Sequence, residues 1–87
     1  MQYNFTGFIT DGENKKSMDL LVTFEKGGFK YGNGYYMNLS GQVNGHPAID
    51  RLFDVRYEVI EDFRSYALDT IKSIWSGKNG SWKFVEA

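Results

Sequence analysis

Residues Met18–Glu25, which read MDLLVTFE, contain the clearest strand pattern in the sequence. Its even-numbered residues are all apolar, and its odd-numbered residues are polar except for Leu21. Successive side chains point to opposite sides of a β-strand, so an alternation with a period of two residues predicts a strand that turns one side toward a hydrophobic core. Leu21 is then an apolar residue on the side that faces away from the core.

The same alternation recurs on both sides of this stretch. It predicts further strands over residues 3–9, 35–43, 53–59 and 81–85. The polar run Asp11–Lys16, which contains Asp-Gly, and the pair Asn44–Gly45 are typical of tight turns between antiparallel strands. Residues 47–51 stay open, because the proline at their start is tolerated in the first turn of a helix and also interrupts a regular strand.

After Glu61 the spacing of the apolar residues changes to that of a helix. Between residues 63 and 75 they recur at intervals of three or four, which places them on one side of an α-helix. Asp62 is a favourable N-cap residue, because its carboxylate accepts a hydrogen bond from a free N–H group of the first turn. Gly77 is typical of the position directly after a helix. This is the one helix that the sequence predicts.

Together these elements predict one α+β domain over residues 1–87. Its order is β-β-β-β-α-β, with an antiparallel sheet of four or five strands and one helix, in the C-terminal half, packed on one face. A single helix covers only one side of a sheet, so the other side stays uncovered. The residues predicted to form the core are Tyr3, Phe5, Ile9, Met18, Leu20, Val22, Phe24, Tyr35, Met37, Leu39, Phe53, Val55, Tyr57, Val59, Trp82 and Phe84, with Phe63, Ala67, Ile71, Ile74 and Trp75 from the helix.

The composition restricts the class of function. Of the 87 residues, 41% are apolar and 17% aromatic, which provides enough buried area for a fold without disulfides. Ten Lys and Arg residues balance eleven Asp and Glu residues, so no global charge attracts nucleic acid or an anionic membrane. The absence of cysteine excludes thiolate nucleophiles and cysteine-ligated zinc. With no pattern of a signal peptide and no long apolar run, we expect a cytoplasmic protein.

Several apolar residues fall on the side of the sheet that the helix leaves uncovered. They are Phe8, Leu21, Tyr36 and Val85. A group of such residues is typical of a contact surface, and tyrosine suits these surfaces because it joins a rigid ring to a polar hydroxyl. The leading hypothesis is therefore a small non-enzymatic protein-binding module that uses Phe8, Leu21 and Tyr36.

The segment Gly27–Gly34 contains four glycines, which disfavours a regular element, and we expect a long connection there. Its aromatic residues Phe29 and Tyr31 would add adaptable contacts to the binding surface. Whether this segment is a functional loop or only a connection stays open. The partner would be a protein of unknown identity, and a homodimer is its simplest form. The small size and the lack of catalytic motifs also fit an accessory or inhibitor protein of a phage or another mobile element.

The alternative is a protein that binds single-stranded nucleic acid. Aromatic residues interleaved with lysine and glycine are typical of surfaces that stack bases beside a basic groove. The residues involved would be Phe29, Tyr31, Tyr35 or Tyr36, with Lys26 and Lys30. The balanced charge argues against this alternative, because strong binding needs several phosphate contacts.

No constellation of catalytic or metal-binding residues stands out. The single histidine, His46, lies beside the turn Asn44–Gly45, and a general base there would need a positioned partner such as Asp54 or Glu61. The run Asp11–Asn14 lacks the spacing of a calcium-binding loop. We therefore predict no enzyme activity, no metal and no cofactor.

Overall fold

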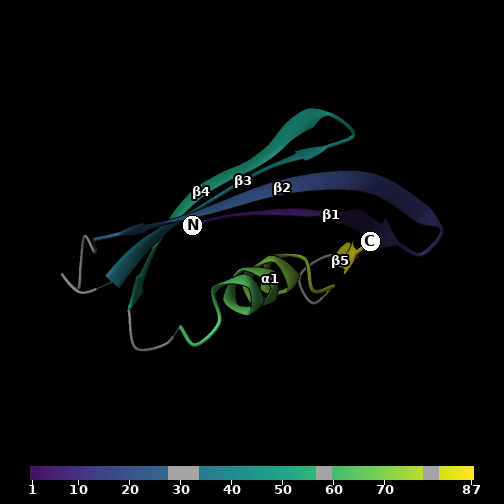
Figure 1. Cartoon of the computed structure of the whole chain (residues 1–87). Coiled ribbons are helices and arrows are strands. Elements are labelled where there is room, and N and C mark those ends of the chain that lie inside the picture. Colours follow the sequence, from purple (N-terminus) through teal and green to yellow (C-terminus); the bar gives the residue numbers. More distant parts are fainter. Residues whose placement is uncertain (28–33, 57–59, 78–80) are drawn as a thin grey trace.

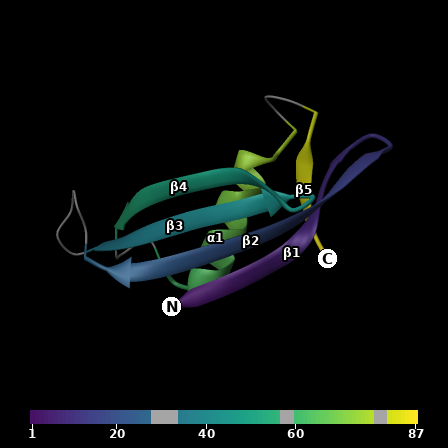
Figure 2. The same cartoon turned by 90° about the horizontal axis from the view of Figure 1, so that it is seen from above.

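The computed structural model describes residues 1–27, 34–56, 60–77 and 81–87. The elements are β1 (Gln2–Asp11), β2 (Asn14–Lys26), β3 (Gly34–Val43), β4 (His46–Arg56), the helix α1 (Phe63–Ile74) and β5 (Lys83–Glu86). The strands form one sheet in the order β4-β3-β2-β1-β5, and every neighbouring pair is antiparallel (Figure 1 and Figure 2). The predicted α+β architecture and the order of its elements are confirmed.

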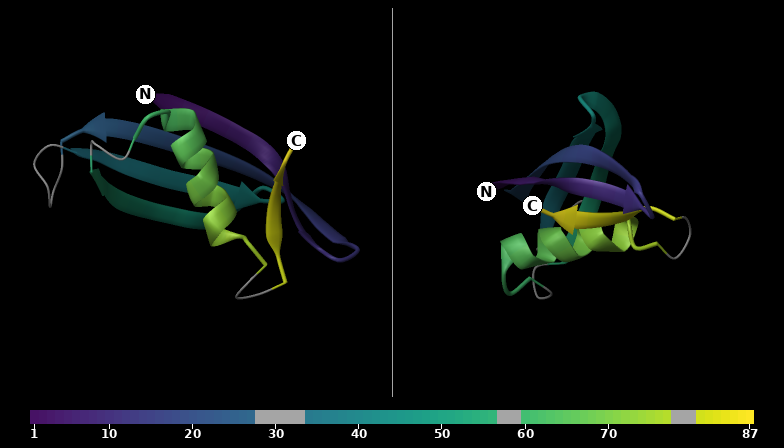
Figure 3. Two further views of the ribbon diagram at one scale, coloured as in Figure 1. Left: turned by 90° about the horizontal axis from the view of Figure 1, so that it is seen from below. Right: turned by 90° about the vertical axis from the view of Figure 1, so that its right-hand side faces the viewer.

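The sheet is curved, and α1 lies on its concave side (Figure 1). The helix crosses the strands obliquely, and β5 runs across the end of the sheet near the turn between β1 and β2 (Figure 3). The convex side of β1–β4 is covered by no element in the described part of the chain (Figure 2). One helix thus covers one face of the sheet, as the sequence predicts. Among the described residues, no helix is long and apolar enough to cross a membrane.

The core lies between the sheet and the helix. Cross-strand partners share a side of the sheet, so the even-numbered residues of β2 and the odd-numbered residues of β1 and β3 face α1. The ring of Phe63 on α1 packs edge-to-face against the rings of Phe24 and Tyr35, with centroids 4.9 Å apart in both pairs. The buried apolar residues are Phe5, Ile9, Met18, Leu20, Val22, Phe24, Met37, Leu39, Val55, Ala67, Ile71 and Phe84. All of them belong to the predicted core, whereas Tyr57 and Val59 lie outside the described residues.

Local interactions set the two ends of α1. Asp62 is the N-cap, and its side chain accepts a hydrogen bond of 3.0 Å from the backbone N–H of Ser65. Beyond the C-cap residue Trp75 the chain turns back through Gly77, whose φ of 77° lies in the left-handed region. Gly77 therefore lies one position later than the sequence predicts. The N–H of Phe84 donates to the carbonyl of Trp75 at 3.0 Å, which holds β5 beside the end of the helix.

The fourth strand begins earlier than the sequence predicts. The alternation indicates a strand from Phe53 and leaves residues 47–51 open to a helical turn. In the structure the strand begins at His46, so residues 47–51 are extended and paired with β3. The last predicted residues of this strand, 57–59, lie outside the described part of the chain.

A β-bulge explains the missed first half of β4. Gly41 pairs with Ile49 but Gln42 pairs with Pro47, so Ala48 is an extra residue without a cross-strand partner. Because of this extra residue, the even-numbered and odd-numbered positions of the strand exchange sides at Ala48. No single alternation of apolar and polar residues therefore runs through the whole strand, and the sequence does not show where the strand begins. Pro47 is tolerated because β4 lies at the edge of the sheet.

The turn between β3 and β4 is Asn44–Gly45, as predicted. Both residues have positive φ, 51° and 81°, as in the type I′ turns that join antiparallel strands. The side-chain oxygen of Asn44 also accepts hydrogen bonds from the N–H and the hydroxyl of Ser17, at 3.1 Å and 3.2 Å. Asn44 therefore fastens the end of the β3–β4 hairpin to β2.

Candidate functional site

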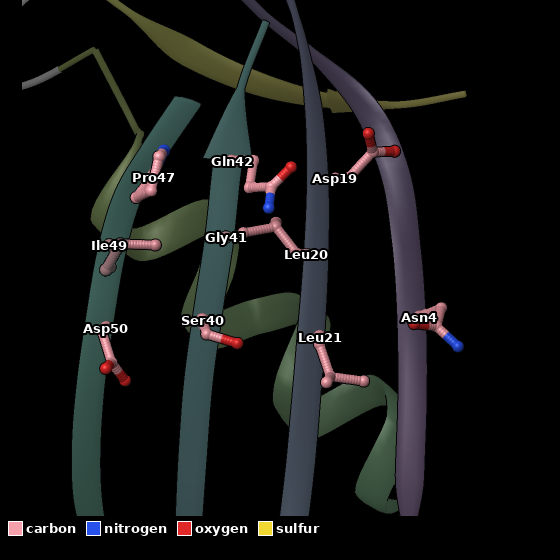
Figure 4. A pocket seen from close by; sticks show the side chains of 10 residues that line it. All are labelled: Asn4, Asp19, Leu20, Leu21, Ser40, Gly41, Gln42, Pro47, Ile49 and Asp50. Atoms are coloured by element: carbon pink, nitrogen blue, oxygen red, sulfur yellow. The ribbon is translucent and has the colours of Figure 1, made fainter. Parts of the chain in front are cut away.

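The convex side of β1–β4, which faces away from α1, is the candidate site, and we call it the open face. Asn4, Leu21, Ser40 and Asp50 form a row across its four strands, with α1 behind them (Figure 4). Because cross-strand partners share a side of the sheet, the register defines the whole set. The open face consists of Gln2, Asn4, Thr6, Phe8, Thr10, Lys15, Ser17, Asp19, Leu21, Thr23, Glu25, Tyr36, Asn38, Ser40, Gln42, Pro47, Asp50, Leu52 and Asp54.

Leu21 lies at the centre of the open face between polar neighbours. Its cross-strand partners are Asn4 on β1 and Ser40 on β3, and Leu21 itself is half-buried. These side chains, together with Asp19 and Gln42, line a shallow hollow of about 440 Å³ (Figure 4). The centre of the face is thus an apolar spot surrounded by hydrogen-bonding groups, an arrangement typical of protein interfaces.

Tyr36 and Leu52 form a second apolar spot toward the outer edge of the sheet. They are diagonal neighbours on β3 and β4, and with Glu25 and Asp54 they line a hollow of about 520 Å³. Leu52 is 65% exposed, the largest exposure among the apolar side chains of the open face. A partner that covered this spot would remove a large apolar area from water.

Phe8 lies at the other end of the face, beside β5. Its cross-strand partners are Ser17 and Val85, and Val85 is 44% exposed. The Lys15 ammonium lies 3.8 Å from the centre of the Phe8 ring, within the range of a cation–π contact. The Phe8 ring is therefore partly covered by a cation of its own chain, and this end of the face is both apolar and basic.

The structure places all three predicted contact residues on the strands, Phe8, Leu21 and Tyr36, on the open face. It does not bring them together, because polar cross-strand pairs separate the three spots. The pair Thr23–Asn38 lies between Leu21 and Tyr36, and the pair Thr6–Asp19 lies between Leu21 and Phe8. The predicted contacts Phe29 and Tyr31 lie outside the described residues. Sequence reasoning missed Leu52, although its alternation with Asp50 and Asp54 could have placed it on the same side of the strand.

Charge is distributed unevenly over the open face. Asp19, Glu25 and Asp50 are exposed, and none of them makes an ion pair within the described part of the chain. Lys15 on this face and Lys83 on β5 both pair with Thr10, at the end that carries Phe8. The part of the face that contains Leu21, Tyr36 and Leu52 is therefore acidic.

The residues of the nucleic-acid alternative do not form one surface where the structure describes them. Tyr35 turns toward the helix, and its ring packs against Phe63. Lys26 is the cross-strand partner of Tyr35 and shares its side of the sheet, whereas Tyr36 lies on the open face. The remaining candidate residues, Phe29, Lys30 and Tyr31, lie outside the described residues.

The candidate catalytic histidine, His46, lies far from Asp54, one of its two suggested partners. His46 pairs with Val43 at the beginning of β4, and Asp54 lies eight positions further along the same strand, about 26 Å away at roughly 3.3 Å per residue. His46 shares the side of Val43, which faces the helix, whereas Asp54 is on the open face. Among the described residues, no group of three His, Asp or Glu side chains could hold a metal ion.

No protein-family model matches this chain, and neither a curated protein nor a solved structure matches it. The function therefore has to be inferred from the chain's own geometry. Its main features are an uncovered sheet face, two apolar spots on the acidic part of that face, and a third apolar spot beside the lysines.

Proposed function

We propose that this chain is a non-enzymatic protein-binding module that contacts its partner through the open face. The observation that carries the proposal is that one side of four long strands is covered by no described element, yet presents apolar side chains between hydrogen-bonding groups. Burying exposed apolar surface contributes about 25 cal/mol per Å². Leu21 and the pair Tyr36–Leu52 are the groups on the acidic part of the face that would contribute in this way.

The charges of the open face support a protein partner over nucleic acid. The exposed carboxylates of Asp19, Glu25 and Asp50 surround the apolar spots. Carboxylates repel phosphate groups and attract lysine and arginine, so they complement a basic protein surface. The partner surface expected from this arrangement carries apolar side chains with basic residues around them.

The glycine-rich segment joins the sheet beside the Tyr36–Leu52 spot. The N–H of Gly27 donates to the carbonyl of Gly34 at 3.1 Å, and Gly27 lies next to the Tyr36 ring. A partner seated on this spot would be close to both ends of the segment. Phe29 and Tyr31 therefore stay predicted contacts, and a role as an accessory or inhibitor protein of a mobile element stays a hypothesis.

The test is affinity capture from the native host with the native chain and with the double variant Leu21→Thr, Tyr36→Thr. Threonine keeps the preference for a strand and removes the apolar surface. The exposed helix residue Lys72, changed to Ala, provides a control on the other side of the molecule. We expect the native chain and the control to retain the same protein, identified by mass spectrometry, and the double variant to lose most of it.

Light scattering identifies the homodimer as the partner if the native chain has twice the mass of the double variant. The proposal fails if the double variant, with an unchanged unfolding midpoint, retains the same partner and the same mass as the native chain. It also fails if a fluorescent single-stranded oligonucleotide binds the native chain tightly at low salt and loses affinity steeply as salt is raised, because that dependence indicates phosphate contacts.

A further inference from the structure

β4 is a free edge of the sheet. In the described part of the chain it pairs only with β3, and beyond the bulge its pairing runs without a shift over Ile49–Val55. The outward N–H and C=O groups of an edge strand can bind an additional strand through main-chain hydrogen bonds. Pro47 and the bulge at Ala48 limit such pairing to the part of β4 that follows them.

A groove of about 620 Å³ lies beside this edge, between β4 and α1 on the concave side. Met37 and Phe53 from the sheet and Ile74 from the helix contribute apolar surface to it, and Arg51 and Asp69 contribute charges. A strand that paired with β4 would turn every second side chain toward this groove. The edge and the groove together therefore match an extended chain better than a flat protein surface.

The side chains of β4 define which extended chain fits. On the open face the strand presents Asp50, Leu52 and Asp54 in succession, and on the groove side it presents Arg51 and Phe53. Directly opposite residues of two antiparallel strands interact most favourably when they have opposite charges or are both apolar. The matching strand thus carries a basic, an apolar and a basic residue at alternate positions.

We propose that β4 binds an extended segment of the protein partner as a sixth strand, with Lys or Arg residues opposite Asp50 and Asp54 and an apolar residue opposite Leu52. This inference rests on the proposed function and specifies the partner. The intervening side chains of the segment enter the groove beside Arg51 and Phe53. Binding therefore extends the sheet and leaves the centre of the open face, around Leu21, available to the rest of the partner.

A second copy of this chain fits the edge less well. Consider the antiparallel register that pairs all of Ile49–Val55 with the same residues of another copy. In it, Asp50 of each copy lies opposite Asp54 of the other copy. Like charges directly opposite each other destabilise a strand pair. The charges on β4 thus disfavour self-pairing in this register and favour a basic partner segment.

The experiment uses the full chain and two blocked synthetic peptides. The probe peptide is Thr-Lys-Ile-Val-Glu-Lys-Thr, which places its lysines opposite the aspartates and its glutamate opposite Arg51 in the antiparallel register. The control peptide, Thr-Glu-Ile-Val-Lys-Glu-Thr, exchanges the charges at the same positions. We expect the amide resonances of Ile49–Val55 to shift on titration, with a Kd at least about fivefold lower for the probe than for the control peptide.

Two charge variants test whether the preference between the peptides depends on the edge strand or on the charge of the open face as a whole. Asp50→Lys places a cation on the edge strand and turns one of the three opposite-charge pairs with the probe peptide into a like-charge pair, so we expect it to weaken the preference for the probe over the control peptide. Asp19→Lys makes the same change of charge at an exposed position of β2, two strands away from β4, and we expect it to keep the native preference. Both positions are exposed, so both variants are expected to fold.

Three results would overturn the inference. The first is equal affinity for the two peptides, or no shift at about 1 mM of either. The second is a set of shifts that spares β4. The third is a set of shifts in β4 that appears when the chain alone is concentrated, because it would assign the edge to a second copy.

The inference and the proposed function can fail separately. If the probe peptide does not bind but the double variant Leu21→Thr, Tyr36→Thr still loses a captured partner, only the edge inference is wrong. If the probe peptide binds at β4 but the double variant retains the partner, the edge binds the segment and the role of the open face is wrong.

Discussion

Gly7 lies where β5 pairs with β1, and this close pairing depends on the lack of a side chain at Gly7. A Cβ atom at this position would lie 2.2 Å from the carbonyl oxygen of Val85 and 3.0 Å from the ring of Phe84. The nearest atom belongs to the backbone, so it cannot move aside as a flexible side chain can. β5 would have to shift as a whole to admit a larger residue.

We therefore expect Gly7→Ala to lower the free energy of unfolding by about 3 kcal/mol, since overpacking of a close backbone contact costs roughly this much. Urea denaturation followed by circular dichroism measures the change. Asn4→Ala, on the exposed side of the same strand, provides the control and is expected to stay within about 0.5 kcal/mol of the native chain. Equal midpoints for Gly7→Ala and Asn4→Ala would show that β5 does not approach β1 so closely.

Among the secondary-structure elements, the sequence predicts the regular strands and the helix well, and the irregular strand β4 poorly. β2 keeps one alternation over its length, and α1 has a cap residue at the predicted position. The first half of β4 combines Pro47 with the extra residue Ala48, so its alternation changes phase in the middle. A pattern with one fixed period cannot detect such a change, because the bulge is defined by the pairing with β3.

The cap of α1 provides a prediction at this scale. Asp62→Ala removes the acceptor of the Ser65 N–H and is expected to destabilise the protein by about 1 kcal/mol. Glu61→Ala changes a neighbouring exposed carboxylate that is not the N-cap and is expected to have an effect below about 0.5 kcal/mol. Thermal unfolding of the two variants compares them, and an equal loss of stability would contradict the assigned cap.

For the whole molecule, the two faces of the sheet differ in what their apolar residues do. Ile71 is completely buried between α1 and the sheet, whereas Leu52 on the open face is 65% exposed. We expect Ile71→Ala to cost about 3 kcal/mol of stability through lost burial and a cavity. Leu52→Ala is expected to cost less than about 0.5 kcal/mol. Urea unfolding of both variants tests this asymmetry, and a large loss for Leu52→Ala would mean that the open face belongs to the core.

The candidate site is only partly predictable from the sequence. The alternation places Phe8, Leu21 and Tyr36 on one side of the sheet, which the structure bears out. Two features of the site depend on the register of the strands: the separation of these residues by polar side chains, and the position of the Lys15 ammonium over the Phe8 ring. Turns and the bulge set this register, so the alternation alone does not predict either feature. Leu52 lies directly before the predicted start of its strand at Phe53, although it alternates in phase with Asp50 and Asp54 on the same side.

Footprinting of the complex by hydroxyl radicals tests whether the open face contacts the partner. Side-chain oxidation is compared residue by residue between the chain alone and the chain bound to its captured partner. We expect slower oxidation of Leu21, Tyr36 and Leu52 in the complex, with no change on the exposed side of α1. Protection confined to α1, with Leu21, Tyr36 and Leu52 oxidised as fast as in the chain alone, would contradict it.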